Sequence, residues 1–227
     1  MSPESANTLA GPSSSSASTR DRLVDTMAAA LCRRGYHGIG LAELLEQAGA
    51  PKGVLYHHFP GGKAELALAA IQRVVERLAA SLDRVAAVGA DPVPMLRQWL
   101  AAAEQQLSRS GFEHGCPLAT VALESTADDV ALRAALAEGF ATLRGHLAAA
   151  LAAGGIAPPR AIRLAALTVA AYEGALMQAR VAGDVQPMRD AAETLLELIG
   201  AEMPSRPSRP SPPSAPAPGP STSGTDR

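Results

Sequence analysis

The chain has 227 residues and a formal net charge of −2, so it is not a uniformly basic nucleic-acid-binding protein, and any contact with a polyanion must come from a local patch. It has two cysteines, no apolar run near the roughly 20 residues that a membrane span needs, and no N-terminal signal pattern. We therefore expect a soluble, cytoplasmic protein.

The composition divides the chain into segments. Residues 1–17 and 203–227 are dominated by Ser, Pro, Gly and Ala, which predicts disordered tails. Between them Ala and Leu are abundant and apolar residues recur at spacings of three and four, which predicts an all-α fold of about nine helices. Short helices come first and long ones follow, so we expect a small head at 18–62 and a larger helical body at 63–202.

The head is expected to contain three helices. The first begins at STRD (18–21), a possible capping box, and ends at Gly35. Its apolar face consists of Leu23, Met27, Ala30 and Leu31. LAELLEQAG then predicts a two-turn helix, Leu41–Ala48, which Gly49 ends, and another short helix follows to about His58. Two short helices joined by a tight turn match a helix-turn-helix, although many helical hairpins look alike.

Long helices are expected in the body. The first begins at Lys63, carries an apolar stripe and ends near Gly89. The later helices are expected at about 92–108, 116–124, 129–153 with Asp128 as its cap, 158–181 and 188–201.

One segment of the head resembles a known family. The sequence AGAPKGVLYHHFPGGKAEL (48–66) is similar to the recognition-helix signature of the TetR family of transcriptional repressors, which is usually near AGVSKGTLYHHFPSKEAL. The resemblance extends over about 19–66. It implies a helix-turn-helix DNA-binding domain at 18–62 and an effector-binding and dimerisation domain at 63–202.

The same segment contains a local excess of positive charge. The chain's only two lysines, Lys52 and Lys63, lie in it, and no carboxylate occurs between Ala48 and Ala64. Codon bias could also have placed the lysines there. Lys63 is expected in the first turn of a helix, where its charge opposes the macrodipole unless an anion binds there. A DNA phosphate would supply that anion.

The residues of the second of the two short helices, which ends at about His58, are expected to divide between a side that packs on the core and a side that faces DNA. Leu55 and Phe59 lie four apart and would anchor the helix. The resemblance implies that Tyr56 and Lys63 hold the DNA backbone and that the start of the helix reads bases. The predicted DNA-binding residues are Lys52, Gly53, Val54, Tyr56, His57, His58 and Lys63. The alternative for Tyr56 is a core aromatic with a satisfied hydroxyl.

Two positions depart from the family pattern. Gly40 stands where the family usually has a Thr or Ser that caps the first helix of the motif, and Leu45 replaces a usual small residue. A missing cap weakens the helix slightly and removes a hydroxyl contact to phosphate. Leu45 would change the angle between the two helices of the motif.

The last two helices are the expected dimer interface. Small residues crowd 162–182, and Leu195, Leu196, Leu198 and Ile199 give the final helix an apolar face. The alternative is that these residues form intramolecular core. A two-fold dimer would read a pseudo-palindromic operator.

The body also holds most of the candidates for an apolar pocket. The predicted ligand-binding residues are Met95, Trp99, Phe112, Cys116, Phe140, Tyr172 and Met177. EHGCPLATVALE (113–124) resembles the corresponding segment of the TetR subgroup typified by lincomycin- and flavonoid-responsive repressors, which implies a lipophilic or aromatic effector.

We expect no metal, no cofactor and no enzyme activity. His114 and Cys116 are too few for a structural zinc site, and the chain has no nucleophile elbow, phosphate-binding glycine loop or HExxH sequence. The leading hypothesis is a homodimeric, nucleoid-associated repressor that a small effector releases from its operator. The alternative is a helical small-molecule-binding protein or enzyme that has lost DNA binding.

Overall fold

The computed structural model describes residues 18–89 and 91–203, and in these ranges the chain forms nine helices and no strand, which confirms the predicted all-α fold. Apart from Met203, the expected tails at 1–17 and 203–227 lie outside the described residues. None of the helices in the described ranges is long and apolar enough to cross a membrane. The helices are α1 (Thr19–Arg34), α2 (Leu41–Ala48), α3 (Lys52–His58), α4 (Gly62–Ala86), α5 (Pro92–Arg109), α6 (Pro117–Glu124), α7 (Val130–Ala153), α8 (Pro158–Ala182) and α9 (Gln186–Ala201).

Local signals set the ends of the first three helices, which we call the head. The Ser18 hydroxyl accepts from the backbone N–H of Asp21 at 3.1 Å, so the expected cap of α1 is present. Gly49 ends α2 in the left-handed region, with φ of 59°. Leu55 and Phe59 are buried against α1 and α2, as their spacing predicts.

Two later helices begin at positions that differ from the prediction. Asp129, not Asp128, precedes α7, because the Asp129 carboxylate accepts from the backbone N–H and hydroxyl of Thr126 and closes the turn before the helix. α9 begins at Gln186, two residues before Met188. Pro187 falls in its first turn, where the missing N–H has no intrahelical partner to lose.

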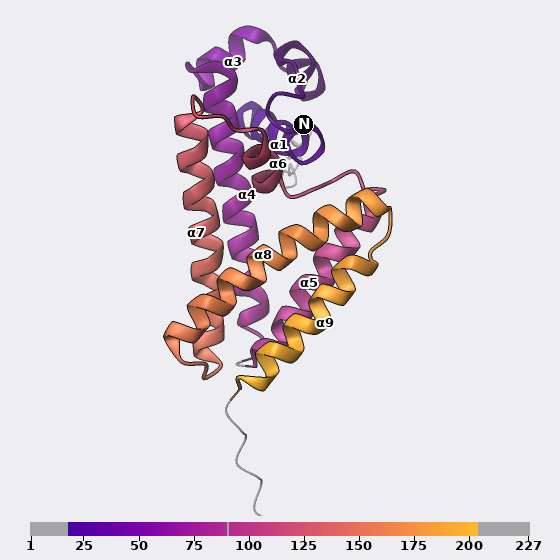
Figure 1. Ribbon diagram of the computed structural model, residues 1–227. Coiled ribbons are helices and arrows are strands. Elements are labelled where there is room, and N and C mark those ends of the chain that lie inside the picture. The colour runs from indigo at the N-terminus through magenta and orange to yellow at the C-terminus, as the bar shows by residue number, and fades with distance from the viewer. Residues whose placement is uncertain (1–17, 90, 204–227) are drawn as a thin grey trace, which may run out of the picture.

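The remaining helices form the body (Figure 1). α4 runs out of the head along the length of the body, α7 lies beside it, and α8 crosses towards α5 and α9. Gly139 of α7 permits close packing: a Cβ there would lie 2.7 Å from Val75 of α4 and 2.9 Å from Leu118 of α6. The three helices therefore meet with almost no intervening space.

Polar contacts fix the head to the body. Arg73 of α4 binds Asp21 at 2.5 Å and Asp25 at 3.2 Å. At the C-terminal end of α1, the Gly115 N–H donates to the Cys32 carbonyl at 3.1 Å, and Arg180 of α8 donates to the Arg33 carbonyl at 3.0 Å. Carbonyls in the last turn of a helix lack intrahelical partners, so the body here completes the end of α1.

Candidate functional site

The outer face of α3 presents polar groups with no partner among the described residues. Lys52, Gly53, Tyr56 and His57 are exposed, and no hydrogen bond or ion pair in the described ranges engages their side chains or the half-buried His58. Val54 is half-buried. A Cβ built on Gly53 would meet nothing within 4 Å, so another backbone can approach closely there. The predicted burial of Leu55 and Phe59 is confirmed, and of the residues predicted to face outwards Val54 and His58 are half-buried.

Tyr56 lies across the start of α4. Its ring covers Gly62, where an added Cβ would be 3.3 Å from Tyr56 Cε1, and Gly62 has φ of 66°. Tyr56 is 45% exposed, so it is not a core aromatic. The ring packs on the backbone while the hydroxyl remains available to an outside group.

The Lys63 ammonium group has partners within the protein that the sequence did not predict. Its ammonium donates to the carbonyl oxygen of Tyr36 at 2.6 Å and lies 4.5 Å from the centre of the Tyr36 ring. Burial lowers the Lys63 pKa, and the nearby Glu124 carboxylate raises it. The protein itself therefore supplies a partially negative partner at the start of α4, where we expected a DNA phosphate alone to do so.

Gly40 caps α2 without a side chain. Its backbone is extended, with φ of −75° and ψ of 148°, no side-chain cap bond is present, and a Cβ would meet nothing within 4 Å. A Ser or Thr would fit there. Leu45, the second departure from the family pattern, is buried in the core of the head.

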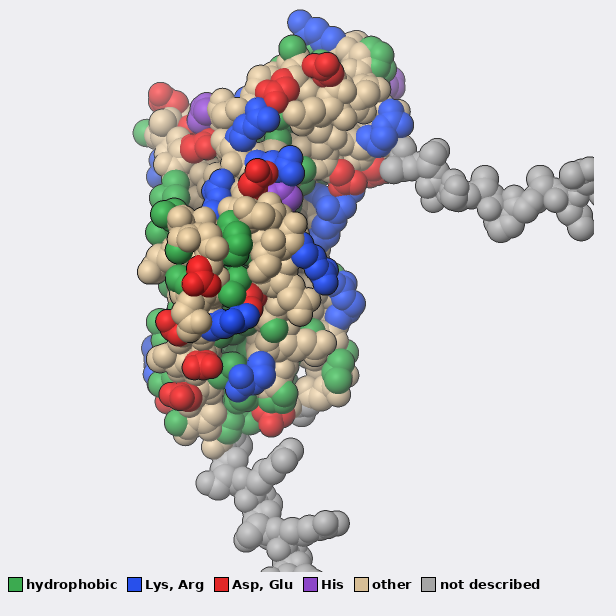
Figure 2. Space-filling model, turned by 90° about the vertical axis from the view of Figure 1, so that its right-hand side faces the viewer, with side chains coloured by type: hydrophobic (Ala, Val, Ile, Leu, Met, Phe, Trp, Pro, Cys, Tyr) green, Lys and Arg blue, Asp and Glu red, His purple; other side chains and the backbone are tan. Residues whose placement is uncertain are grey.

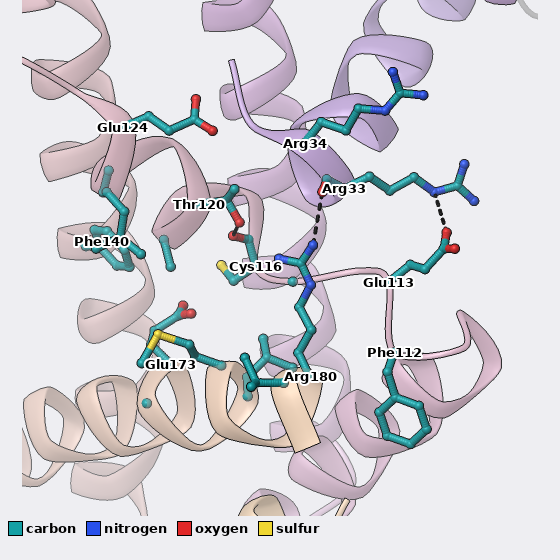
Figure 3. Close-up of a pocket in the computed structure, with 18 residues that line it drawn as sticks. Arg33, Arg34, Phe112, Glu113, Cys116, Thr120, Glu124, Phe140, Glu173 and Arg180 are labelled. Atoms are coloured by element: carbon teal, nitrogen blue, oxygen red, sulfur yellow. Dashed lines mark hydrogen bonds and ion pairs between the residues drawn. The ribbon is translucent and has the colours of Figure 1, made fainter. Parts of the chain in front are cut away.

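A cavity of about 1000 Å³ lies where the head meets the body. Its wall combines the last turn of α1, the segment before α6, α6 itself, α7 and α8 (Figure 3). The lining residues include Phe112, Cys116, Ala119, Phe140, Leu176 and Met177. This volume suits a drug-sized, mainly apolar molecule.

The cavity wall also contains a carboxylate with one buried oxygen atom. Glu173 of α8 points into the cavity, close to the Cys116 thiol (Figure 3). Within the described residues, its Oε2 is the one buried side-chain oxygen or nitrogen atom without a hydrogen-bond partner. Burial raises the Glu173 pKa to about 7, and the Cys116 thiol beside it has a smaller, lowering effect.

The predicted ligand-binding residues divide between two sides of α8. Phe112, Cys116, Phe140 and Met177 line the large cavity. Tyr172 lines a smaller one, of about 250 Å³, between α5, α8 and α9. Trp99 packs on Tyr172 with ring centres 5.1 Å apart and donates to Ser81 at 3.0 Å, and Met95 is buried core; neither lines either cavity.

Sequence reasoning missed several residues of the large cavity. These are chiefly Arg33, Arg34, Glu113, Glu124, Glu173 and Arg180. One signal was available for Glu173, since it is the single acidic residue of α8 and has small or apolar neighbours. No comparable signal marks Glu124, whose partners lie far away in sequence.

Glu124 connects the cavity to the head. Its carboxylate accepts from the backbone N–H groups of Tyr36 at 2.8 Å and His37 at 3.0 Å. Gly35 makes this approach possible: its φ is 72°, and an added Cβ would lie 1.6 Å from Glu124 Oε1. Since Lys63 binds the carbonyl of Tyr36, residue 36 is held from α6 and from α4 at once.

Two sequence profiles match the chain. Residues 23–70 match "Bacterial regulatory proteins, tetR family", and residues 92–194 match "Transcriptional regulator LmrA/YxaF-like, C-terminal domain". The uncharacterized HTH-type transcriptional regulator Rv0196 of Mycobacterium tuberculosis is 33% identical over 195 residues, which cover 82% of this chain and 97% of that protein. The chain belongs to the TetR family.

Other TetR-family proteins agree with the architecture. The HTH-type transcriptional regulator LmrA of Bacillus subtilis is 25% identical over 181 residues, 80% of this chain and 96% of that one. The crystal structure of a TetR regulatory protein from Rhodobacter sphaeroides superposes with a TM-score of 0.71 at 26% identity, covering 79% of this chain and 97% of that one. The protein is thus a TetR-family transcriptional regulator with an LmrA/YxaF-like C-terminal domain, and ligand-responsive repression is the typical function of this family.

Proposed function

We propose that the protein is a homodimeric repressor that binds a pseudo-palindromic operator through α3 and is released by a small lipophilic effector in the large cavity. The observation that carries this proposal is the place of the cavity. Its wall includes the last turn of α1, so a molecule bound there touches the head as well as the body. The repressor would act in the cytoplasm, on DNA of the nucleoid.

The DNA contacts divide by role. Tyr56 and Lys63 lie at the junction of α3 and α4 and would bind phosphates, which positions the head. Lys52, Gly53 and Val54 begin α3 and would meet base edges in the major groove. His57 and His58 would donate to phosphate or base edges.

Local contacts matter because the protein has no general positive field. Acidic and basic side chains are interspersed on the face drawn in Figure 2, and a basic side chain lies at the tip of the head. With a net charge of −2, steering over long distances is weak. Affinity must then come from the groups of α3 and the start of α4, used twice in a dimer.

We place the dimer contact chiefly on α8. Four large apolar side chains on this helix, Ile162, Leu167, Met177 and Val181, are exposed in the single chain, and Met177 and Val181 also line the large cavity. The exposed Ala166 and Ala170 lie on the same helix. By contrast, Leu195, Leu196 and Ile199 of α9 are buried within the subunit against α5 and α8. For these α9 residues the intramolecular alternative is the better reading, and α9 would add only its remaining exposed surface.

We infer that the route from cavity to DNA passes through residue 36. An effector that displaces Glu124 releases two backbone N–H groups of the 36–37 segment. Movement of this segment displaces the Tyr36 carbonyl that accepts from Lys63. The start of α4 then moves relative to α3. A 100-fold loss of operator affinity requires about 2.7 kcal/mol of coupling, which is comparable to a few hydrogen bonds.

An electrophoretic mobility-shift assay tests the proposal. DNA from upstream of the protein's own gene is titrated with the protein at two salt concentrations, with a shuffled sequence of equal length as control. We expect a sequence-preferring complex that weakens steeply with salt. Absence of such a complex on upstream DNA would refute the repressor function.

A further inference from the structure

The large cavity has room for many apolar molecules, so its selectivity depends on its polar groups. Nearly all of these groups already have partners in the described residues. Arg34 binds Glu43 at 2.7 Å, Arg33 binds the ring of His114 at 2.8 Å, and Arg180 binds a backbone carbonyl. These three cations lie at the side of the cavity towards α1, as Figure 3 shows.

The acidic groups of the cavity wall differ in whether they have hydrogen-bond or ion-pair partners. Glu113 lies within 3.6 Å of Arg33, and Glu124 accepts from two backbone N–H groups. Glu173 alone among them has a buried oxygen without a partner in the described residues. The cavity therefore presents one unmet requirement, which is for a hydrogen-bond donor or a positive charge beside Glu173.

We propose that the effector is a mainly apolar molecule that carries a basic nitrogen, and that Glu173 binds this nitrogen by a charge-assisted hydrogen bond. The inference rests on the proposed function, because it names the ligand class of the same cavity. Phe140 lines the same cavity, and an aromatic face favours a cation. Rotation about the last torsion of Glu is soft, so either oxygen can turn towards a ligand.

The energetic reason to expect a basic nitrogen in the ligand is the cost of burying an unpaired carboxylate. A carboxylate away from water loses hydration that nothing else replaces. Burial already raises the Glu173 pKa to about 7, so near neutral pH both forms are populated. A protonated amine restores a partner to the ionised form, whereas an acidic ligand would add a second negative charge at the same place.

Binding of matched probes tests this class. The probes are a biphenyl with a four-carbon chain that ends in an amine, in an alcohol or in a carboxylate, so that the apolar body is constant. Isothermal titration calorimetry measures each dissociation constant on the full-length protein at neutral pH. We expect the amine to bind about tenfold or more tightly than the alcohol, and the carboxylate to bind most weakly.

Variants assign the effect to one side chain. Glu173→Gln keeps the shape and removes the charge, so the amine should lose about tenfold or more in affinity while the alcohol changes little. Glu138→Gln makes the same change on the exposed side of α7, outside the cavity lining, and should bind all three probes as the parent does. No amine binding, carboxylate binding as tight as that of the amine, or an unchanged amine affinity in Glu173→Gln would overturn the proposal.

Operator binding, measured on the same samples, separates this inference from the repressor function. If the amine binds through Glu173 but leaves the operator complex intact, the ligand class stands and effector release fails. If the operator complex forms and the amine does not bind, the ligand class fails and the repressor function stands.

Discussion

Burial of the Glu173 carboxyl gives stability a defined dependence on pH. The group has an ordinary pKa near 4.5 when unfolded and a pKa of about 7 when folded. Between these values the folded state holds the proton more strongly than the unfolded state, so this group makes stability fall as pH rises. Above about pH 7 its full destabilising effect is present.

Glu173→Gln should therefore stabilise the protein at high pH. We expect the free energy of unfolding to rise by about 3 kcal/mol at about pH 8, from a difference of about 2.5 pKa units at about 1.4 kcal/mol each, and to change little at about pH 4.5. Urea denaturation at equal protein concentration measures both values. A gain of the same size at both pH values would show that the variant acts through packing and not through ionisation.

Tyr56 and Lys63 are expected to act on every DNA sequence alike. Tyr56→Phe keeps the ring over Gly62 and removes only the hydroxyl, and Lys63→Ala removes one cation. Each should weaken operator and non-operator binding by a similar factor, and Lys63→Ala should lower the salt slope by about one unit per head. Fluorescence anisotropy on both DNAs over a salt series gives these numbers.

Changes at Lys52 or Val54 provide the contrast. Because these residues begin α3, substitution by Ala should change the preferred bases, at a cost of about 1 to 3 kcal/mol per lost base contact. If all four variants changed sequence preference equally, the division into phosphate and base contacts would be wrong. Lys63→Ala also needs a thermal melt, since the ammonium binds Tyr36 within the protein.

Residues of α3 were predictable because their roles follow from helix period alone. Leu55 and Phe59 are four apart and buried, and Tyr56 and His57 between them are exposed. The partner of Lys63 was not predictable, because Tyr36 lies 27 positions away in sequence. Glu173 was missed for a related reason: its meaning depends on an enclosing cavity that no local pattern encodes.

The N-terminus of helix α2 lacks a side-chain cap, and a substitution at the cap position should supply one. Gly40 leaves the first turn without a side-chain acceptor, and there is space for one. Gly40→Ser should raise the free energy of unfolding by about 0.3 kcal/mol, and Gly40→Ala should lower it by a similar amount, because alanine offers no acceptor. Denaturant midpoints of the three proteins test the order; alanine equal to serine would mean that capping is not the cause.

Element boundaries show what sequence signals can and cannot locate. Glycine in a left-handed conformation ended α2 at the predicted residue. The starts of α7 and α9 were placed wrongly by one and two residues, because a side chain can bond backwards, as Asp129 does, and because proline is accepted inside a first turn. The conformation of the preceding turn determines where such a helix begins, and that conformation depends on more than residue type.

In the whole molecule, the exposed apolar residues of α8 form the dimer contact that we propose. A charge placed among them should oppose dimerisation, so Leu167→Glu should shift the protein towards monomer and weaken operator binding. Ala137→Glu, on the exposed side of α7, is the matched control. Sedimentation equilibrium measures the association; an unchanged dimer in Leu167→Glu would place the interface elsewhere.

The apolar face of α9 illustrates a limit on predicting assemblies. Periodicity identified that face, yet Leu195, Leu196 and Ile199 are buried by α5 and α8 of the same chain. A pattern of apolar residues states that a surface is covered and does not state by which element. The cavity has the same origin, since its lining comes from four stretches that are distant in sequence, 33–34, 112–124, 140 and 173–181.

The peptide groups around Tyr36 lie between the proposed effector site and the proposed phosphate contact, so the coupling between effector and operator binding can be measured directly. Glu124 accepts from the N–H of this residue and Lys63 donates to its carbonyl. In the proposed mechanism, a phosphate that binds Lys63 and a ligand that moves Glu124 therefore compete through one backbone unit. Thermodynamic linkage makes such competition reciprocal. Operator DNA must therefore weaken effector binding by the same factor by which effector weakens operator binding, and a titration of effector into the preformed DNA complex reads the coupling without any measurement of repression.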